Sequence, residues 1–192
     1  MTMPLTSPFT ACSVPGSTRD FIAQRRALPW FHHGVLHLFI DHCQKACVGD
    51  LPFLSYELGT RPIAGPLQQP LLTQTHAIVE ANLAPTWTHR GFVQPRRKWH
   101  RVANWMGFRE ITFPEDPLFH QRFRVTSSSP NPHQQLHDGL RRALLDTRLI
   151  SLAWSETRVA IHRPGPLSQE KRESFQHSSI KLLTSFLPCP PA

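Results

Sequence analysis

The sequence predicts an α+β fold, with an antiparallel sheet and helices packed mainly on one face of it. Apolar and polar residues alternate with period two in three segments of the first half, and helical spacing dominates two segments of the last third. Short turn signals join neighbouring strands as hairpins. With 192 residues, 40% of them hydrophobic, the chain is long enough to bury one core without disulfides.

Strands are expected at 35–44, 51–58 and 71–83. In the first, Leu36, Leu38 and Ile40 alternate with polar or aromatic residues. A turn at 48–50 joins the first two strands as a hairpin, and the third is expected to run antiparallel to the second.

The second half alternates between helices and short strands. Residues 84–97, which contain two prolines, are expected to be irregular. Helices are expected at 98–106, 133–147 and 167–187, and strands at 109–113, 122–126, 149–154 and 158–162, the last two as a hairpin.

The domain organisation follows from proline and glycine positions. Residues 1–28 are expected to form a flexible tail, 29–187 a single α+β domain, and 188–192 a second tail. No apolar run is long enough for a transmembrane segment, and no secretory signal opens the chain. Four cysteines are too few for a disulfide framework, so we expect reduced thiols and a cytoplasmic location.

Several motifs resemble an uncharacterised bacterial protein family, a domain of unknown function. Residues 99–125 read WHRVANWMGFREITFPEDPLFHQRFRV, which is similar to that family's FPEDPEFSRRF-like central motif. The segments GDLPFLSYEL at 49–58, LTQTHAIVEANL at 72–83 and RVAIHRPGPL at 158–167 follow in the family's order, although RPIAGPLQQP replaces its basic loop. The resemblance spans roughly residues 30–187, implies a shared fold and implies no reaction.

No catalytic motif is present. The chain has no Walker loop, no G-x-G-x-x-G and no G-x-S-x-G elbow. Glu115 and Asp116 are adjacent, so we interpret them as helix-capping residues rather than as an acid–base pair. We therefore expect no enzyme activity and no cofactor.

Two groups have side chains that suit a metal ion. Cys43 and Cys47 have His37 and His42 nearby, and His133 and His137 lie four residues apart in an expected helix. Both groups lack a full ligand set in sequence, so free thiols and a solvated helix face are the preferred interpretations.

The strongest charge signal is the basic segment, which we define as residues 89–101 (HRGFVQPRRKWHR). The chain carries a net charge of +8, and residues 61–110 hold seven basic groups against two acidic ones. Cations interleaved with aromatic residues suit a nucleic acid or another polyanion. The candidate polyanion-binding residues are Arg90, Arg96, Arg97, Lys98 and Arg101.

Together these observations favour a non-catalytic accessory or interaction protein whose partner is another protein. The alternative is binding of RNA, DNA or another polyanion through the basic segment. A more distant alternative is a metal-dependent enzyme that uses His37, His42, Cys43 or Cys47.

Overall fold

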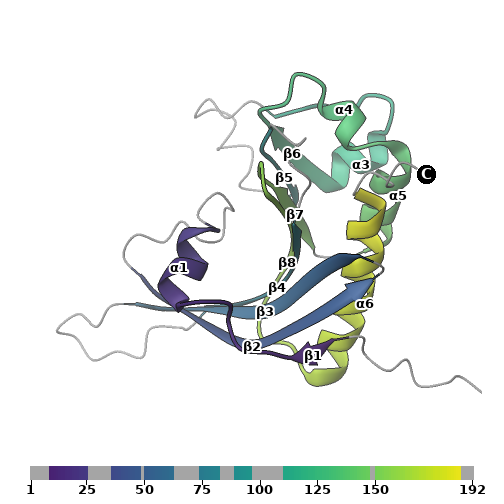
Figure 1. The fold of residues 1–192 in the computed structure, drawn as a ribbon. Helices are drawn as coiled ribbons and strands as arrows, with labels where there is room; N and C mark the ends of the chain where they lie inside the picture. Colours follow the sequence, from purple (N-terminus) through teal and green to yellow (C-terminus); the bar gives the residue numbers. More distant parts are fainter. Residues whose placement is uncertain are drawn as a thin grey trace, which may run out of the picture.

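The computed structural model describes residues 9–25, 36–48, 50–62, 74–82, 89–96, 110–147 and 150–186. Its centre is an antiparallel sheet of eight strands in the order β1-β2-β3-β4-β8-β7-β5-β6 (Figure 1). The strands are β1 (Thr10–Ala11), β2 (Leu36–Val48), β3 (Leu51–Pro62), β4 (Gln74–Asn82), β5 (Gly91–Pro95), β6 (Phe123–Ser127), β7 (Ser151–Trp154) and β8 (Arg158–Pro164).

Helices cover this sheet unequally. Helix α6 packs against β4, β8 and α5, while α1 lies against β2 on the other side of the sheet (Figure 1). The α+β fold with helices mainly on one face is thereby confirmed. The five helices of the described residues are α1 (Thr18–Ala23), α3 (Pro117–Arg122), α4 (Pro132–Gln135), α5 (Asp138–Asp146) and α6 (Gln169–Phe186).

The two faces of the sheet have separate cores. On β4, Ala77, Val79 and Ala81 enter the larger core, which α5 and α6 complete through residues such as Leu140 and Leu183. Since alternate residues of a strand point to opposite faces, the intervening Ile78 enters a smaller core. There it meets Phe21 of α1 and Tyr56 and Leu58 of β3. Between Ala77 and Ala81, strand β4 is therefore apolar on both sides, apart from Glu80.

The N-terminal segment belongs to the fold. Strand β1 pairs with β2, with Thr10 opposite Lys45. Ser17 caps α1, and Phe21 and Arg25 are almost fully buried. The expected flexible tail over 1–28 is therefore corrected for residues 9–25, because an aromatic ring and a guanidinium of this segment are enclosed against the sheet.

Three predicted elements differ in the structure. Strand β5 lies within 84–97, which were expected to be irregular; Pro95 stands at its end, where a proline is tolerated. Residues 109–113 contribute only an isolated bridge from Ile111 to Val125. The helix expected at 133–147 is divided into α4 and α5, because the His137 ring accepts a hydrogen bond from the Leu140 N–H and begins a new helix.

The remaining predicted elements agree or lie outside the description. The strand expected at 71–83 runs antiparallel to β3, with Ile78 opposite Tyr56. The hairpin of β7 and β8 and the terminal helix also form where the pattern predicts them. The helix expected at 98–106 lies outside the described residues. Within the described part of the chain, none of the helices combines the length and apolar character that crossing a membrane requires.

Candidate functional site

A cavity of about 520 Å³ lies at one end of the central strands, between them and the N-terminal segment. We call it the α1 cavity, because residues that precede and follow α1 form one wall. Its lining residues are Cys12, Ser13, Pro15, Gln24, Arg25, Lys45, Pro52, Phe53, Leu54, Glu80, Ala81, Asn82 and Arg158.

Strand register brings the polar lining residues together. Lys45 lies opposite Leu54, and Leu54 lies opposite Glu80, so all three share one face of the sheet. Asn82 follows Glu80 by two residues on β4 and shares its face, and Arg158 of β8 lies opposite Asn82. Helix α1 then adds its C-cap residue Gln24 and the following Arg25 from above.

Glu80 is the centre of the charged cluster in this cavity. Its side chain is 2% exposed. Both of its carboxylate oxygens accept a hydrogen bond from the Arg25 Nε, each at 2.9 Å. The Tyr56 hydroxyl donates at 2.8 Å, and the Arg158 Nη1 donates at 3.1 Å. Buried charges are stable only when they are paired and hydrogen-bonded, and Glu80 meets both conditions.

The Arg25 guanidinium contacts Phe21 as well as Glu80. Its Nη1 donates to the Phe21 carbonyl at 2.9 Å, and its central carbon lies 3.3 Å from the centre of the Phe21 ring. A cation over an aromatic face is stabilised by the ring quadrupole. Phe21 in turn meets Tyr56 edge to face, with 5.2 Å between the ring centres. The cluster therefore fixes α1 to β3 and β4.

Arg158 is less completely satisfied than Arg25. Besides Glu80, its guanidinium reaches the Asn82 Oδ1 at 3.0 Å and the Gln24 Oε1 at 3.2 Å. Its Nε is buried and has no hydrogen-bond partner within the described segments. The Glu80 carboxylate thus pairs with two guanidiniums, those of Arg25 and Arg158.

The cavity carries a surplus of positive charge. Among the lining residues that the structure describes, Arg25, Lys45 and Arg158 are cationic and Glu80 alone is acidic, which gives this described lining a net charge of +2. Clefts lined by one sign of charge concentrate ions of the opposite sign. Pro15 and Leu54 supply apolar surface beside these charges.

Tyr56 remains protonated at neutral pH. Burial raises the pKa of its hydroxyl well above the usual value, and the negative charge of Glu80 raises it further. The phenol is therefore a fixed hydrogen-bond donor to Glu80. Three side chains donate to Glu80, and its carboxylate holds the guanidiniums of Arg25 and Arg158.

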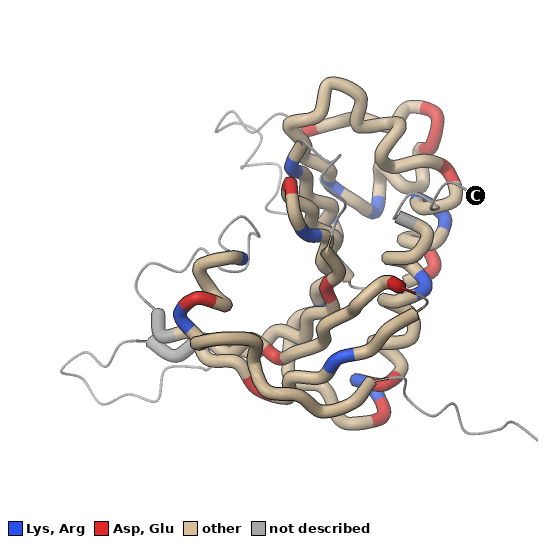
Figure 2. Tube along the Cα trace, viewed as in Figure 1, with Lys and Arg blue, Asp and Glu red and all other residues tan. Residues whose placement is uncertain are grey.

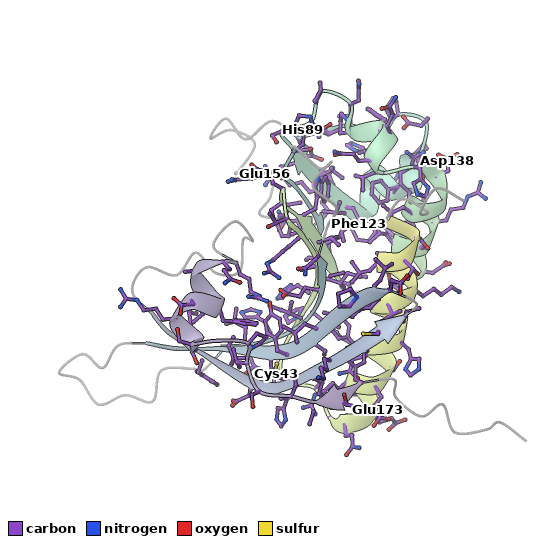
Figure 3. All side chains as sticks on the ribbon, viewed as in Figure 1. Cys43, His89, Phe123, Asp138, Glu156 and Glu173 are labelled. Atoms are coloured by element: carbon purple, nitrogen blue, oxygen red, sulfur yellow. The ribbon has the colours of Figure 1, made fainter. Side chains whose placement is uncertain are left out.

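The two candidate polyanion-binding residues that the structure describes, Arg90 and Arg96, do not line this cavity. Figure 3 shows Glu156, the ion-pair partner of Arg90, at the end of the sheet far from Cys43. The Arg90–Glu156 pair is exposed, with a separation of 3.3 Å. Arg96 pairs with the buried carboxylate of Glu110 and donates to the His120 carbonyl at 3.1 Å. Arg97, Lys98 and Arg101 lie outside the described residues.

The candidate metal ligands are dispersed. His42 is exposed at a backbone bulge with a φ of 51°, while Cys43 contacts Cys12 and Cys47 is exposed. His133 bonds to Glu115 at 3.0 Å, whereas His137 bonds to the Ser185 carbonyl at 3.2 Å. The side chain of His37 lies outside the description. No cluster of three or more potential ligands occurs in the described part of the chain.

Glu115 and Asp116 have the structural role that their position indicates. The Asp116 carboxylate caps α3 by accepting from the Phe119 N–H at 3.1 Å. It also accepts from the Arg141 Nε at 3.2 Å, and Glu115 lies 3.4 Å from the same guanidinium. These acidic residues therefore join α3 to the buried Arg141 of α5.

Sequence reasoning missed Arg25, Tyr56, Glu80 and Arg158 as site residues. One signal was present: Glu80 is the single charged residue in the run AIVEAN of an expected strand. A carboxylate in such a strand needs a buried cation, but the pattern does not indicate which arginine supplies it.

No protein-family model, curated protein or solved structure matched the chain. The resemblance of its central motif to an uncharacterised family stays a prediction.

Proposed function

We propose that this protein is a non-catalytic binding protein whose α1 cavity takes a small organic anion. The observation that carries the proposal is the charge imbalance of the cavity, where the buried Arg25 and the partly buried Arg158 share the Glu80 carboxylate and the exposed Lys45 adds a third cation. An anionic ligand offsets this surplus positive charge.

The geometry favours a carboxylate or phosphate head group. Arginine presents planar N–H donors that match the oxygens of either group, and hydrogen bonds between charged partners are stronger than neutral ones. The volume of about 520 Å³ lies within the range of small-molecule pockets. Pro15 and Leu54 offer surface for a short apolar body attached to the head group.

Two features support binding over catalysis. Glu80 is fully engaged by three donors, and Tyr56 holds its proton. The protonated phenol of Tyr56 is not poised to act as a general base at neutral pH. A partner protein, as the sequence predicts for an accessory protein, remains compatible with a ligand-dependent interaction.

Calorimetric titration tests the proposal directly. Benzoate, octanoate, phenyl phosphate and inorganic phosphate are titrated into the full chain, with benzamide and octanamide as neutral analogues. We expect at least one anion with an apolar body to bind with a Kd below about 1 mM. The neutral analogues are expected to bind at least tenfold more weakly, because they lack the charge that the cavity complements.

Two variants locate the binding. Arg158→Gln and Lys45→Gln each remove one cation of the cavity, and each is expected to weaken binding about tenfold or more. Arg163→Gln removes a cation from the same strand β8 outside the cavity and serves as the matched control. If no anion binds below 1 mM, or if Arg163→Gln weakens binding as much as Arg158→Gln, the proposal is wrong.

A further inference from the structure

We propose that Cys12 and Cys43 are a redox-active thiol pair that forms a disulfide and fastens the N-terminal segment to the sheet. Cys12 also lines the α1 cavity, but the disulfide needs no ligand there and is tested separately from the function proposed above.

The two sulfur atoms are already in contact. The Sγ atoms of Cys12 and Cys43 lie 3.4 Å apart, and the Cys12 N–H donates to the Cys43 carbonyl at 3.0 Å. Since a disulfide bond is about 2.05 Å long, the sulfurs need to approach by only about 1.4 Å. The adjacent pairing of Ala11 with Gln44 fixes the two backbones beside each other.

A β-bulge in β2 positions the Cys43 side chain for its contact with Cys12. The register between β2 and β3 shifts between Asp41 and Gln44, and the intervening His42 has a positive φ of 51°. Cys43 therefore has no Cα partner on β3 in the ladder. Its carbonyl instead receives the Cys12 N–H, and Figure 3 shows Cys43 on the side of the sheet where the N-terminal segment runs.

The two thiols are not equivalent. Burial raises the pKa of the Cys43 thiol to about 12, with contributions from the neighbouring Cys12 and from Glu80. Cys43 thus retains its proton at neutral pH, and we assign the first attack on an oxidant to Cys12. Cys47, four residues along β2, is exposed and forms a natural internal control.

The reaction with a small disulfide such as oxidised glutathione balances in two steps. The Cys12 thiolate attacks one sulfur of the oxidant, forms a mixed disulfide and releases one glutathione thiolate. This thiolate accepts the proton of Cys43 as the Cys43 sulfur attacks Cys12 and expels the second glutathione as a thiolate. The protein loses two electrons and its two thiol protons, and the glutathione disulfide gains those electrons to give two thiols once protonated.

The linkage encloses the whole of α1. Residues 12 and 43 are 31 positions apart, and the segment between them carries Phe21 and Arg25. Closing a loop of this length restricts the unfolded chain, which is expected to raise the Tm by about 5–10 °C.

Thiol mapping of the folded protein provides the test. The purified chain is incubated with oxidised glutathione, its remaining thiols are blocked with iodoacetamide, and its peptides are identified by mass spectrometry. We expect a peptide pair joined through Cys12 and Cys43, while Cys47 and Cys189 carry the alkyl group. Recovery of Cys12 and Cys43 in alkylated form, or linkage to Cys47 or Cys189 in similar yield, overturns the proposal.

Serine variants separate disulfide formation from folding. Cys12→Ser and Cys43→Ser are each expected to abolish the oxidation-dependent rise in Tm, whereas Cys47→Ser retains it. Circular dichroism of the reduced variants checks that each one folds. A rise in Tm that survives in folded Cys12→Ser or Cys43→Ser contradicts the proposed linkage.

Discussion

At the scale of single residues, burial decides what each charged group of this chain contributes. Glu80 and Arg25 are almost fully enclosed, so removing Glu80 leaves the buried Arg25 guanidinium without its carboxylate and costs about 3–5 kcal/mol. The Arg90–Glu156 pair has both side chains more than half exposed, and such pairs contribute only about 0–1 kcal/mol. The same chemical interaction therefore organises the α1 cavity in one place and is nearly neutral in another.

Tyr56 offers a direct optical measure of this burial, because it is the only tyrosine in the sequence. The pKa of its hydroxyl is raised well above 10 by burial and by Glu80. We expect no phenolate absorbance near 295 nm as the folded protein passes pH 10. In guanidinium chloride, where the chain is unfolded, the same residue is expected to ionise near its ordinary value of about 10.

The raised pKa also links this residue to stability. Below pH 10 the phenol is protonated in both states, and its contribution is fully present. Above pH 10 the unfolded state releases the proton while the folded state keeps it. The free energy of unfolding is then expected to fall by about 1.4 kcal/mol per pH unit from this group. Ionisation near pH 10 with unchanged circular dichroism contradicts the buried position of Tyr56.

At the scale of elements, local patterns identified strands and helices where one face is consistently apolar. The hairpin of β7 and β8 and the helix α6 satisfy this condition, and both form close to their predicted bounds. Strand β5 was missed because its glycine and proline read as a turn signal. A tertiary contact explains the glycine at position 91. Gly91 lies opposite Trp154, whose ring occupies the space that a Cβ atom would need.

The apolar spacing in the sequence also did not reveal the break between α4 and α5. Leu136, Leu140 and Leu144 are all fully buried, so the apolar spacing continues across the break. Only the capping bond from the Leu140 N–H to the His137 ring marks the new start. A histidine is an uncommon cap, and periodicity alone does not indicate one.

Gly91 provides a test of the role of β5. A Cβ atom at this position would lie 1.9 Å from a ring carbon of Trp154, which is 1% exposed and therefore has little room to move. Gly91→Ala is expected to lower the free energy of unfolding by about 1–3 kcal/mol, as overpacking does in other cores. Urea denaturation followed by tryptophan fluorescence measures the change.

Gly139 is the matched control for this substitution. It is exposed in α5, and a Cβ there would meet only the His137 ring, at an ordinary contact distance of 3.4 Å. Gly139→Ala is expected to leave stability unchanged or raise it by about 0.4–1 kcal/mol, because alanine favours the helix. If both variants are equally stable, the Trp154 ring does not exclude a larger side chain at position 91.

At the scale of the whole molecule, the α1 cavity is assembled from distant parts of the chain. Gln24 and Arg158, which share a hydrogen bond, are 134 positions apart. No spacing rule links residues at such separations, so sequence reasoning located the fold class but not the site. The basic segment was selected because its charges are contiguous, whereas the charges of the cavity converge only when β2, β3, β4 and β8 pair.

The net charge of +8 is the whole-molecule property behind the polyanion hypothesis. Along the described trace, Lys and Arg alternate with Asp and Glu instead of gathering on one side (Figure 2). Arg90 and Arg96 of the basic segment are both paired with carboxylates. The hypothesis therefore depends chiefly on the three remaining candidates, Arg97, Lys98 and Arg101.

A salt titration with a single-stranded oligonucleotide tests these candidates. Each phosphate contact contributes about −0.7 to the slope of log K against log salt for single strands. If the basic segment binds nucleic acid, the double variant Arg97→Gln, Lys98→Gln is expected to lower the magnitude of that slope by about 1.4. Fluorescence anisotropy of labelled oligo(dT) at several salt concentrations measures it.

The control removes the same charge elsewhere. Lys171 and Lys181 are exposed on α6, so Lys171→Gln, Lys181→Gln matches the double variant in net charge without touching the basic segment. Arg96→Gln is a poor probe, because it removes one ion-pair partner of Glu110 and is expected to destabilise the fold. A similar loss of slope in both double variants would mean that net charge alone drives binding. Absence of binding at low salt would remove the polyanion hypothesis, and the α1 cavity would then be the remaining site for an anionic ligand.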